Sequence, residues 1–219
     1  MRLVFASNNA HKLEEVRGIM PEGIEVLSLK DIGFDAEIEE TGTTLEENSA
    51  IKAEAVYHWI LDNGHLTLDG VFADDTGLEI DALGGKPGVY TARWYLMDEG
   101  MKGLMDEWEI FAANRAKALR ELAGKSDRGA QFRTVITLIR LQDGAERLQD
   151  ATLQVEGIVR GRIAEEEYGQ GGFGYDPVFI PEGHDKTFGE LPAAIKNGIS
   201  HRARALANLV ERLEIRGKR

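Results

Sequence analysis

The adjacent carboxylates of Asp74 and Asp75 are the first sign of chemistry in this sequence. They follow the apolar run 71–73 and precede Thr76-Gly77. Carboxylate oxygens at a strand end suit Mg²⁺, which keeps several waters and is commonly shared with substrate phosphates. One of the two could also accept a proton from an attacking water. The alternative is a turn with both acids in solvent. Aspartyl-phosphate chemistry is not expected, because its two aspartates stand two positions apart.

Two further segments could bind phosphate. Residues 7–12, Ser-Asn-Asn-Ala-His-Lys, lie where an apolar strand run turns into a helical pattern. Free N–H groups at the helix start and the cation of Lys12 would make an anion site there, although the glycine-rich Walker pattern is absent. Carboxylates around Glu40, followed by Lys52, could hold a hydrated cation and a phosphate together. The alternatives are an ordinary asparagine N-cap and a charged helix entry.

A glycine-dense loop at residues 169–177 contains G-x-G-x-x-G but lacks the context of a dinucleotide fingerprint. It follows an acidic segment and leads through Asp-Pro into a strand, whereas the fingerprint must follow a strand and open a helix. Its two aromatics, Phe173 and Tyr175, could stack on a base while Asp176 accepts from a ring N–H. The alternative is a loop with Phe173 in the core.

The segment from Lys196 to Ala203 predicts a capped helix start. Ser200 is a good N-cap, which places His201 and Arg202 in the first turn with free backbone N–H groups. Such a turn could bind a carbonyl or an anion. An ordinary capped helix with basic surface residues is the alternative.

The elements that must position these residues follow from hydrophobic periodicity and turn signals. Strands and helices alternate early and a hairpin comes late, which favours a mixed β-sheet flanked by helices, an α/β fold. The expected elements are a strand at 2–6 and a helix after it, a helix from the capping box Thr44/Glu47 to Asn63-Gly64, strands at 71–73 and 78–82 interrupted by the acidic pair, a helix at 101–123, an antiparallel hairpin of 132–141 and 152–163 across the turn 142–144, a strand at 177–181 and a helix at 200–215.

Composition bounds the partners. The 219 residues carry 26 Lys+Arg against 38 Asp+Glu, a formal charge of −12, with 42% hydrophobic residues. One globular domain, or one domain of two lobes, is expected. The acidic balance without clustered basic residues argues against a nucleic-acid partner. No cysteine, no signal-peptide pattern and no long apolar stretch predict a cytoplasmic protein with no membrane partner.

Taken together, these segments resemble the non-canonical purine nucleoside triphosphate pyrophosphatase family, the inosine/xanthosine triphosphate pyrophosphatases. The matching blocks fall in the same order along nearly the whole chain. Three features depart from the family pattern: Asn8 replaces a frequent glycine, Gly189 stands where alanine is usual, and the stretch 95–125 is longer. The matching blocks are residues 5–12, 40–53, 73–93, 171–177 and 196–202.

The resemblance implies an inosine triphosphatase-like fold, a single two-lobed domain over residues 1–219 with a central cleft. It implies hydrolysis of ITP, dITP and XTP to the monophosphate and pyrophosphate, with Mg²⁺, in a homodimer. Asp75, Glu40 and Lys12 would be catalytic, with Asp75 the general base and Asp74 a supporting acid, and Asp75 and Glu40 would hold the metal. The nucleotide would be bound by Ser7, Asn8, Asn9, Ala10, His11, Lys12, Lys52, Thr76, Phe173, Gly174, Tyr175, Asp176, Lys196, Ser200, His201 and Arg202.

Within that set the resemblance divides the work. Ser7, Asn9 and the lysines would hold the triphosphate, the loop aromatics would grip the base, and residues 200–202 would read its 6-keto group. Two other classes stay open: a nucleotide-binding regulator without turnover, and a Mg²⁺-dependent phosphatase that releases orthophosphate. The carboxylates of Glu40, Asp74 and Asp75 argue against the regulator. The identity of the product, orthophosphate or pyrophosphate, distinguishes the phosphatase from the pyrophosphatase.

Overall fold

The computed structural model describes residues 1–64, 67–97, 106–141 and 148–217. The chain divides into two compact units. Unit 1 comprises residues 1–75, 134–157 and 202–219, and unit 2 comprises residues 76–133 and 158–201. Within the described residues, no helix is long and apolar enough to cross a membrane.

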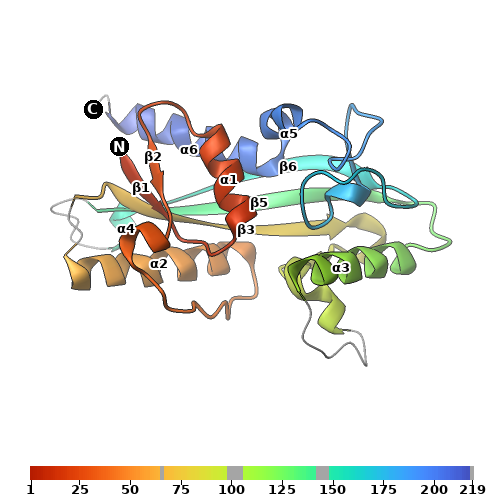
Figure 1. Cartoon of the computed structure of the whole chain (residues 1–219), viewed down its shortest axis with the longest axis horizontal. Helices are drawn as coiled ribbons and strands as arrows, with labels where there is room; N and C mark the ends of the chain where they lie inside the picture. The colour runs from red at the N-terminus through yellow and green to blue at the C-terminus, as the bar shows by residue number, and fades with distance from the viewer. Residues whose placement is uncertain (65–66, 98–105, 142–147, 218–219) are drawn as a thin grey trace. The chain divides into compact units, whose positions relative to one another are not determined.

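The helices and strands are interspersed along the chain, whose course the colours of Figure 1 follow. The strands are β1 (Arg2–Phe5), β2 (Glu25–Leu27), β3 (Gly70–Ile80), β4 (Lys86–Gly88), β5 (Gly129–Arg140), β6 (Thr152–Ile163) and β7 (Phe179–Pro181). The helices are α1 (Ala10–Ile19), α2 (Leu45–Asn63), α3 (Glu107–Glu121), α4 (Leu148–Ala151), α5 (Ala193–Ile199) and α6 (His201–Gly217).

The sheet is mixed, as the sequence predicts. Its strand order is β2-β1-β3-β5-β6-β7, with β4 paired to β3 off this path. Strand β1 runs parallel to both β2 and β3, whereas β4 runs antiparallel to β3 and β7 antiparallel to β6. Parallel pairs need a crossover, which α1 supplies between β1 and β2.

The acidic pair does not interrupt the strand, so the prediction of two separate strands at 71–73 and 78–82 is wrong. Strand β3 runs without a break from Gly70 to Ile80 and passes through both aspartates. Buried carboxylates are tolerated when cations pair with them. Asp74 accepts a hydrogen bond from Lys12, and Asp75 accepts one from Lys52. The backbone can therefore stay in the hydrogen-bonded ladder where the sequence alone indicates a polar turn.

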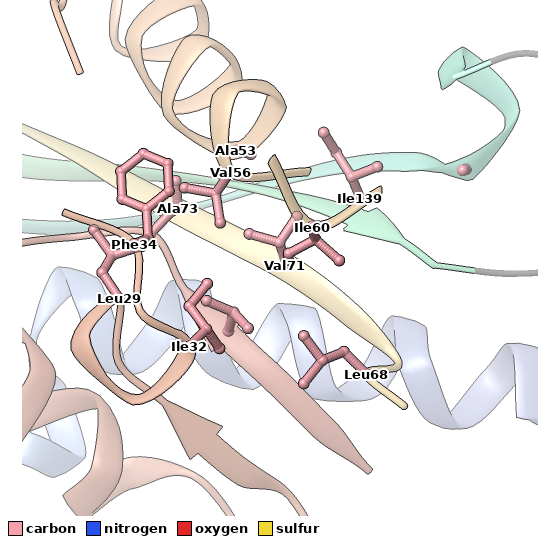
Figure 2. Packing of buried hydrophobic residues seen from close by; sticks show 13 residues of the cluster. Leu29, Ile32, Phe34, Ala53, Val56, Ile60, Leu68, Val71, Ala73 and Ile139 are labelled. Atoms are coloured by element: carbon pink, nitrogen blue, oxygen red, sulfur yellow. The ribbon is translucent and has the colours of Figure 1, made fainter. Parts of the chain in front are cut away.

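Side-chain alternation along β1 and β3 divides the core of unit 1 into two clusters. Val71 and Ala73 of β3 pack with Val56 and Ile60 of α2, as Figure 2 shows. The intervening Phe72 packs with a second cluster that includes residues of α1 and α6. In Figure 1, α1 and α6 lie on one side of these strands and α2 on the other. Consecutive residues of β3 therefore face different helices.

Unit 2 has its own core around the aromatic side chains of its strands and loops. Phe132 of β5 lies edge-on to Phe179 of β7, with ring centroids 4.7 Å apart. Tyr175 and Phe188 belong to the same buried cluster. This cluster fixes the loops that follow β6, where the predicted base-binding residues lie.

Several predicted elements are confirmed and others begin elsewhere. Helix α2 has the capping box of Thr44 and Glu47 and ends at Gly64, whose φ is 73°. Strand β6 has the predicted bounds. Helix α3 begins at Glu107 instead of Met101, because Asp106 and Glu109 form a capping box of their own. Residues 101–105 and the predicted turn 142–144 lie outside the described residues.

Candidate active site

The start of α1 is built by side chains that satisfy its free backbone N–H groups. Asn9 is the N-cap, and its Oδ1 accepts the backbone N–H of Lys12 at 2.9 Å. The Ser7 hydroxyl accepts the N–H of Asn9 at 3.2 Å. These two contacts fix the backbone at the start of the helix, and Lys12 projects from the first helical turn. The predicted neighbours Asn8 and Ala10 are exposed, and His11 is half-buried.

Asp74 of β3 lies between two cations. Its Oδ1 is 2.8 Å from Nζ of Lys12, and its Oδ2 is 2.9 Å from both Nε and Nη2 of Arg202. Arg202 also donates from Nη1 to the carboxylate of Glu15 in α1. Asp74 and Arg202 are each 1% exposed. A carboxylate this deep is stable only when it is paired, and here α1 and α6 supply the partners.

Asp75 faces α2 and meets a different cation. Nζ of Lys52 is 3.2 Å from Oδ1 of Asp75 and 3.1 Å from Oε2 of Glu40. Asn48, one turn before Lys52, accepts the N–H of Gly42 at 2.8 Å and so holds the segment that carries Glu40. Oδ2 of Asp75 is buried and has no hydrogen-bond partner among the described residues. This oxygen is placed to accept a proton or to bind a cation.

The two aspartates differ in their proton affinity. Burial raises the pKa of the Asp75 carboxyl, against the opposing charges of Lys52 and Lys12. Burial also acts on Asp74, but the charges of Lys12 and Arg202 overcome it and hold the pKa of that carboxyl well below its usual range. Burial alone would lower the pKa of Lys52, yet Asp75 and Glu40 raise it. Asp74 is therefore a fixed negative charge, and Asp75 is the carboxylate suited to take a proton.

We call the side chains of Lys12, Glu15, Glu40, Lys52, Asp74, Asp75 and Arg202 the charged cluster; all belong to unit 1. It sets four carboxylates against three cations and so carries one net negative charge. A polyphosphate would be repelled unless a further cation joins it. Among the described residues, no group of three or more His, Asp or Glu side chains is placed to hold a metal ion.

The donor set nevertheless fits Mg²⁺ shared with a substrate. Mg²⁺ is usually held by one or two carboxylates, with waters and substrate phosphates as the other ligands. Asp75 offers the buried oxygen without a partner, and Glu40 shares Lys52 with it. The two carboxylates thus suit a metal that arrives with a phosphate.

Unit 2 contains a second, smaller group of polar residues in the glycine-dense loop. Oδ2 of Asp176 accepts the N–H of Phe173 at 2.8 Å and lies 2.6 Å from Nζ of Lys196. The same Nζ is 4.9 Å from the ring centroid of Phe173. A Cβ at Gly172 would lie 2.0 Å from Oδ2 of Asp176, so the loop closes on this carboxylate only with glycine there.

The neighbouring loop residues are held by their own partners. Tyr175 is 3% exposed, and its hydroxyl donates to the carbonyl of Thr91 at 3.0 Å. Burial raises the pKa of this phenol. Arg115 of α3 donates to the carbonyl of Gly174 at 2.9 Å. Phe173 is half-buried, so of the two loop aromatics it is the more exposed.

The predicted turn at residues 200–202 is divided between the units. Ser200 and His201 belong to unit 2 and Arg202 to unit 1. His201 stacks on Phe132 with ring centroids 4.8 Å apart. All three side chains are buried, whereas the predicted Thr76 is half-buried.

The structure therefore gathers the predicted residues into two groups. The charged cluster, with residues 7–12, can hold phosphate and activate water; the second group, in unit 2, can stack on a base and hydrogen-bond to it. Two contacting residues were missed from the sequence, Glu15 and Arg115. Glu15 resembles any exposed helix acid, although its spacing of three from Lys12 places both on one helix face.

The sequence is also similar to known proteins over nearly its whole length. The sequence model of the Ham1 family matches residues 3–212. The chain is 45% identical over 214 residues to a dITP/XTP pyrophosphatase of Bacillus subtilis, covering 96% of each protein. It is 43% identical over 213 residues to a dITP/XTP pyrophosphatase of Flavobacterium johnsoniae, covering 97% of this chain and 98% of that one.

Solved structures show the same similarity. The Ham1 protein of Staphylococcus aureus is 36% identical, with a TM-score of 0.76 and complete coverage of both chains. A HAM1 protein of Coxiella burnetii is 35% identical, also with a TM-score of 0.76, over 98% of both chains.

Proposed function

The chain belongs to the Ham1 family, and on that premise we propose that it hydrolyses ITP, dITP and XTP to the nucleoside monophosphate and pyrophosphate. This reaction would remove non-canonical purine nucleotides from the pool. One observation carries the proposal: the buried Oδ2 of Asp75 has no partner among the described residues and lies on a carboxylate paired with Lys52. The names of the relatives, dITP/XTP pyrophosphatase, support the choice of substrate.

In the proposed reaction, water attacks the α-phosphorus and the bond from that phosphorus to the α,β-bridging oxygen breaks. Asp75 takes a proton from the water, and the electron pair of the broken bond leaves with pyrophosphate. Lys12 and Lys52 would bind the phosphate oxygens, since both belong to the charged cluster. Ser7 and the N-terminal turn of α1 would orient the same chain of phosphates.

Magnesium is part of this proposal, held by Asp75 and Glu40. When bound, it would neutralise charge on the phosphates and so ease departure of pyrophosphate. The net negative charge of the charged cluster and the oxygen without a partner support this assignment. Glu40 would orient the attacking water together with Asp75.

The base would be bound by the unit 2 residues. Phe173 would stack on it, and Lys196 and Asp176 would fix its position. The turn at Ser200 and His201 would present donors to the 6-keto oxygen. Adenine presents an amino donor there instead, and an unpaired buried donor costs about 1–3 kcal/mol, roughly tenfold to hundredfold discrimination.

Product analysis with Mg²⁺ tests the proposal. ITP, XTP, GTP and ATP are each incubated with the wild type, with Asp75→Asn and with the exposed control Asp62→Asn. We expect pyrophosphate and monophosphate from ITP and XTP, a loss of about 10²–10⁴-fold for Asp75→Asn, and no change for the control. Orthophosphate as the direct product would favour a phosphatase, and tight ITP binding without turnover would favour a regulator.

The assembly and compartment are further parts of the proposal. The family resemblance implies a homodimer, and the composition of the sequence predicts the cytoplasm. Light scattering of the purified chain tests the dimer, which a mass near the 24.2 kDa of one chain would contradict.

A further inference from the structure

The guanidinium of Arg202 pairs with two carboxylates of unit 1. Its Nε and Nη2 each lie 2.9 Å from Oδ2 of Asp74, and its Nη1 donates to Glu15. The residue is 1% exposed, and Glu15 has a side-chain exposure of 14%. To reach a base, the guanidinium would have to leave two carboxylates, and an unpaired buried charge is strongly destabilising.

The same contacts connect Arg202 to a lysine that we assign to the triphosphate. Asp74 holds Arg202 by Oδ2 and Lys12 by Oδ1, at 2.8 Å. Lys12 and Glu15 lie three residues apart in α1, on one face of that helix. The contacts therefore form a closed ring, in which α1 supplies both ends, β3 supplies Asp74 and α6 supplies Arg202.

A ring of this kind fixes the position of a flexible side chain. Lysine has a long stem with many rotamers, and a short contact to a buried carboxylate limits them. Asp74 in turn is held by the planar fork of Arg202, which lysine could not reproduce. Glu15 completes the arrangement by pairing with the other end of that fork.

We propose that Arg202 and Glu15 are positioning residues for the phosphate side of the reaction: Glu15 fixes Arg202, Arg202 fixes Asp74, and Asp74 fixes Lys12. This proposal rests on the proposed function and deepens it. It gives the Arg202 side chain a role different from the base reading that the family resemblance implies, and it assigns a role to Glu15, which accepts a hydrogen bond from Nη1 of Arg202.

The proposal makes a distinctive prediction about selectivity. Arg202→Lys and Glu15→Gln should lower kcat/KM by about 10–100-fold, the usual effect of losing a partner that orients a working group. Because the triphosphate is common to all nucleotides, the loss should be equal for ITP, XTP and ATP. A residue that reads the 6-keto oxygen would instead change the ratio between ITP and ATP, which differ at that position.

The experiment measures kcat and KM for ITP, XTP and ATP in six proteins: wild type, Glu15→Gln, Arg202→Lys, the double variant, Glu14→Gln and His201→Ala. Glu14 is the exposed neighbour of Glu15 on α1, so its variant is the matched control. We expect equal losses across nucleotides for both single variants, a double variant no worse than the more severe single variant, and wild-type rates for Glu14→Gln. His201→Ala is the reference for a variant that changes the ratio.

A binding measurement provides a second readout that is independent of the base. Calorimetry with inorganic triphosphate should show weaker binding to Glu15→Gln than to wild type, because this probe has only phosphates. A changed ITP-to-ATP ratio for Arg202→Lys, or unchanged triphosphate binding and activity for Glu15→Gln, would overturn the proposal. If Arg202→Lys does not fold, the partly exposed Glu15→Gln still decides the question. Failure of the proposed function is distinct, because wild type would then release no pyrophosphate.

Discussion

Unit 1 and unit 2 both bury charge, but they compensate it in different ways. In unit 1, carboxylates and cations from α1, α2, β3 and α6 pair with one another in the charged cluster. In unit 2, the buried pair of Asp176 and Lys196 is framed by aromatic rings, with Nζ of Lys196 4.9 Å from the centroid of Phe173 and 5.9 Å from that of Phe188.

The difference matches the two parts of the proposed substrate. A triphosphate is recognised by its negative charge. Because electrostatic attraction is not directional, the cations that bind it must be held at fixed positions. A purine is recognised by its flat face and a few edge atoms, for which rings and single donors are enough. We therefore expect changes in unit 1 to affect all nucleotides alike, and changes in unit 2 to depend on the base.

The largest expected effect tests how each unit tolerates the loss of a buried carboxylate. Asp74→Asn leaves Arg202 and Lys12 without their shared charge and should lower the free energy of unfolding by about 3–5 kcal/mol. Asp176→Asn should cost less, because two rings still face the Lys196 cation. Urea denaturation at pH 7 without metal measures both, and equal losses would contradict the comparison.

The pH dependence of the same variants sharpens the test. The folded pKa of Asp74 lies below its unfolded value, so its contribution to stability is complete above about pH 4–5 and is lost as pH falls toward the folded pKa. Wild type should therefore lose stability with acid more steeply than Asp74→Asn. Urea midpoints between pH 3 and pH 7 measure this, and parallel curves would show that the pairing of Asp74 does not stabilise the fold.

The next effect concerns catalysis in unit 1. Lys52→Met keeps the length of the side chain but removes the cation between Asp75 and Glu40. We expect kcat/KM to fall by about 10²–10³-fold for every nucleotide, as when a donor to developing charge is lost. Steady-state rates with ITP, XTP and GTP measure it, with the exposed Lys30→Met as control. A loss confined to one base would break the division between the units.

A smaller effect is expected for the stacking residue of unit 2. Phe173→Ala removes the half-buried ring and should raise KM by about tenfold to hundredfold, since stacking on a base contributes about 1–3 kcal/mol. Phe173→Leu retains most of the volume without the ring and separates stacking from packing. Inorganic triphosphate, used as a competitive inhibitor, has no base. If its inhibition constant rises as much as KM for XTP, the ring does not act on the base.

The smallest expected effect comes from Tyr175. Tyr175→Phe removes the hydroxyl that donates to the Thr91 carbonyl and should lower the free energy of unfolding by about 1 kcal/mol. Nucleotide ratios should not change, because the ring is buried in the unit 2 core. Urea denaturation with the exposed Tyr168→Phe as control measures it. A change in the XTP-to-GTP ratio would show that the Tyr175 hydroxyl acts on the base.

The sequence predicts the long, strongly patterned elements well and the short ones poorly. The capping box of α2 and the span of β6 follow from local chemistry. Strands β2 and β4 have three residues each and carry too little pattern to detect. Helix α5 begins at Ala193, and its N-cap Pro192 makes no capping hydrogen bond through its side chain, so the helix lacks a polar start signal.

The site shows the same limit at longer range. The types of Lys12, Lys52 and the acidic pair indicate phosphate chemistry, but their pairing depends on the fold. Arg202 is 128 residues from Asp74 along the chain, and no local pattern indicates that contact. The continuity of β3 through two aspartates likewise follows from cations that only tertiary structure brings near.

Because Asp74 and Asp75 face different helices from one strand, this segment can exchange residues more easily than it can change length. Removing or adding one residue before Asp74 would turn each following side chain to the opposite face of β3. The lysine of α2 would then meet the carboxylate that belongs to Arg202, and apolar neighbours would meet a charge. Over evolutionary time, insertions and deletions should therefore accumulate in the connections that flank β3, while the strand keeps its spacing.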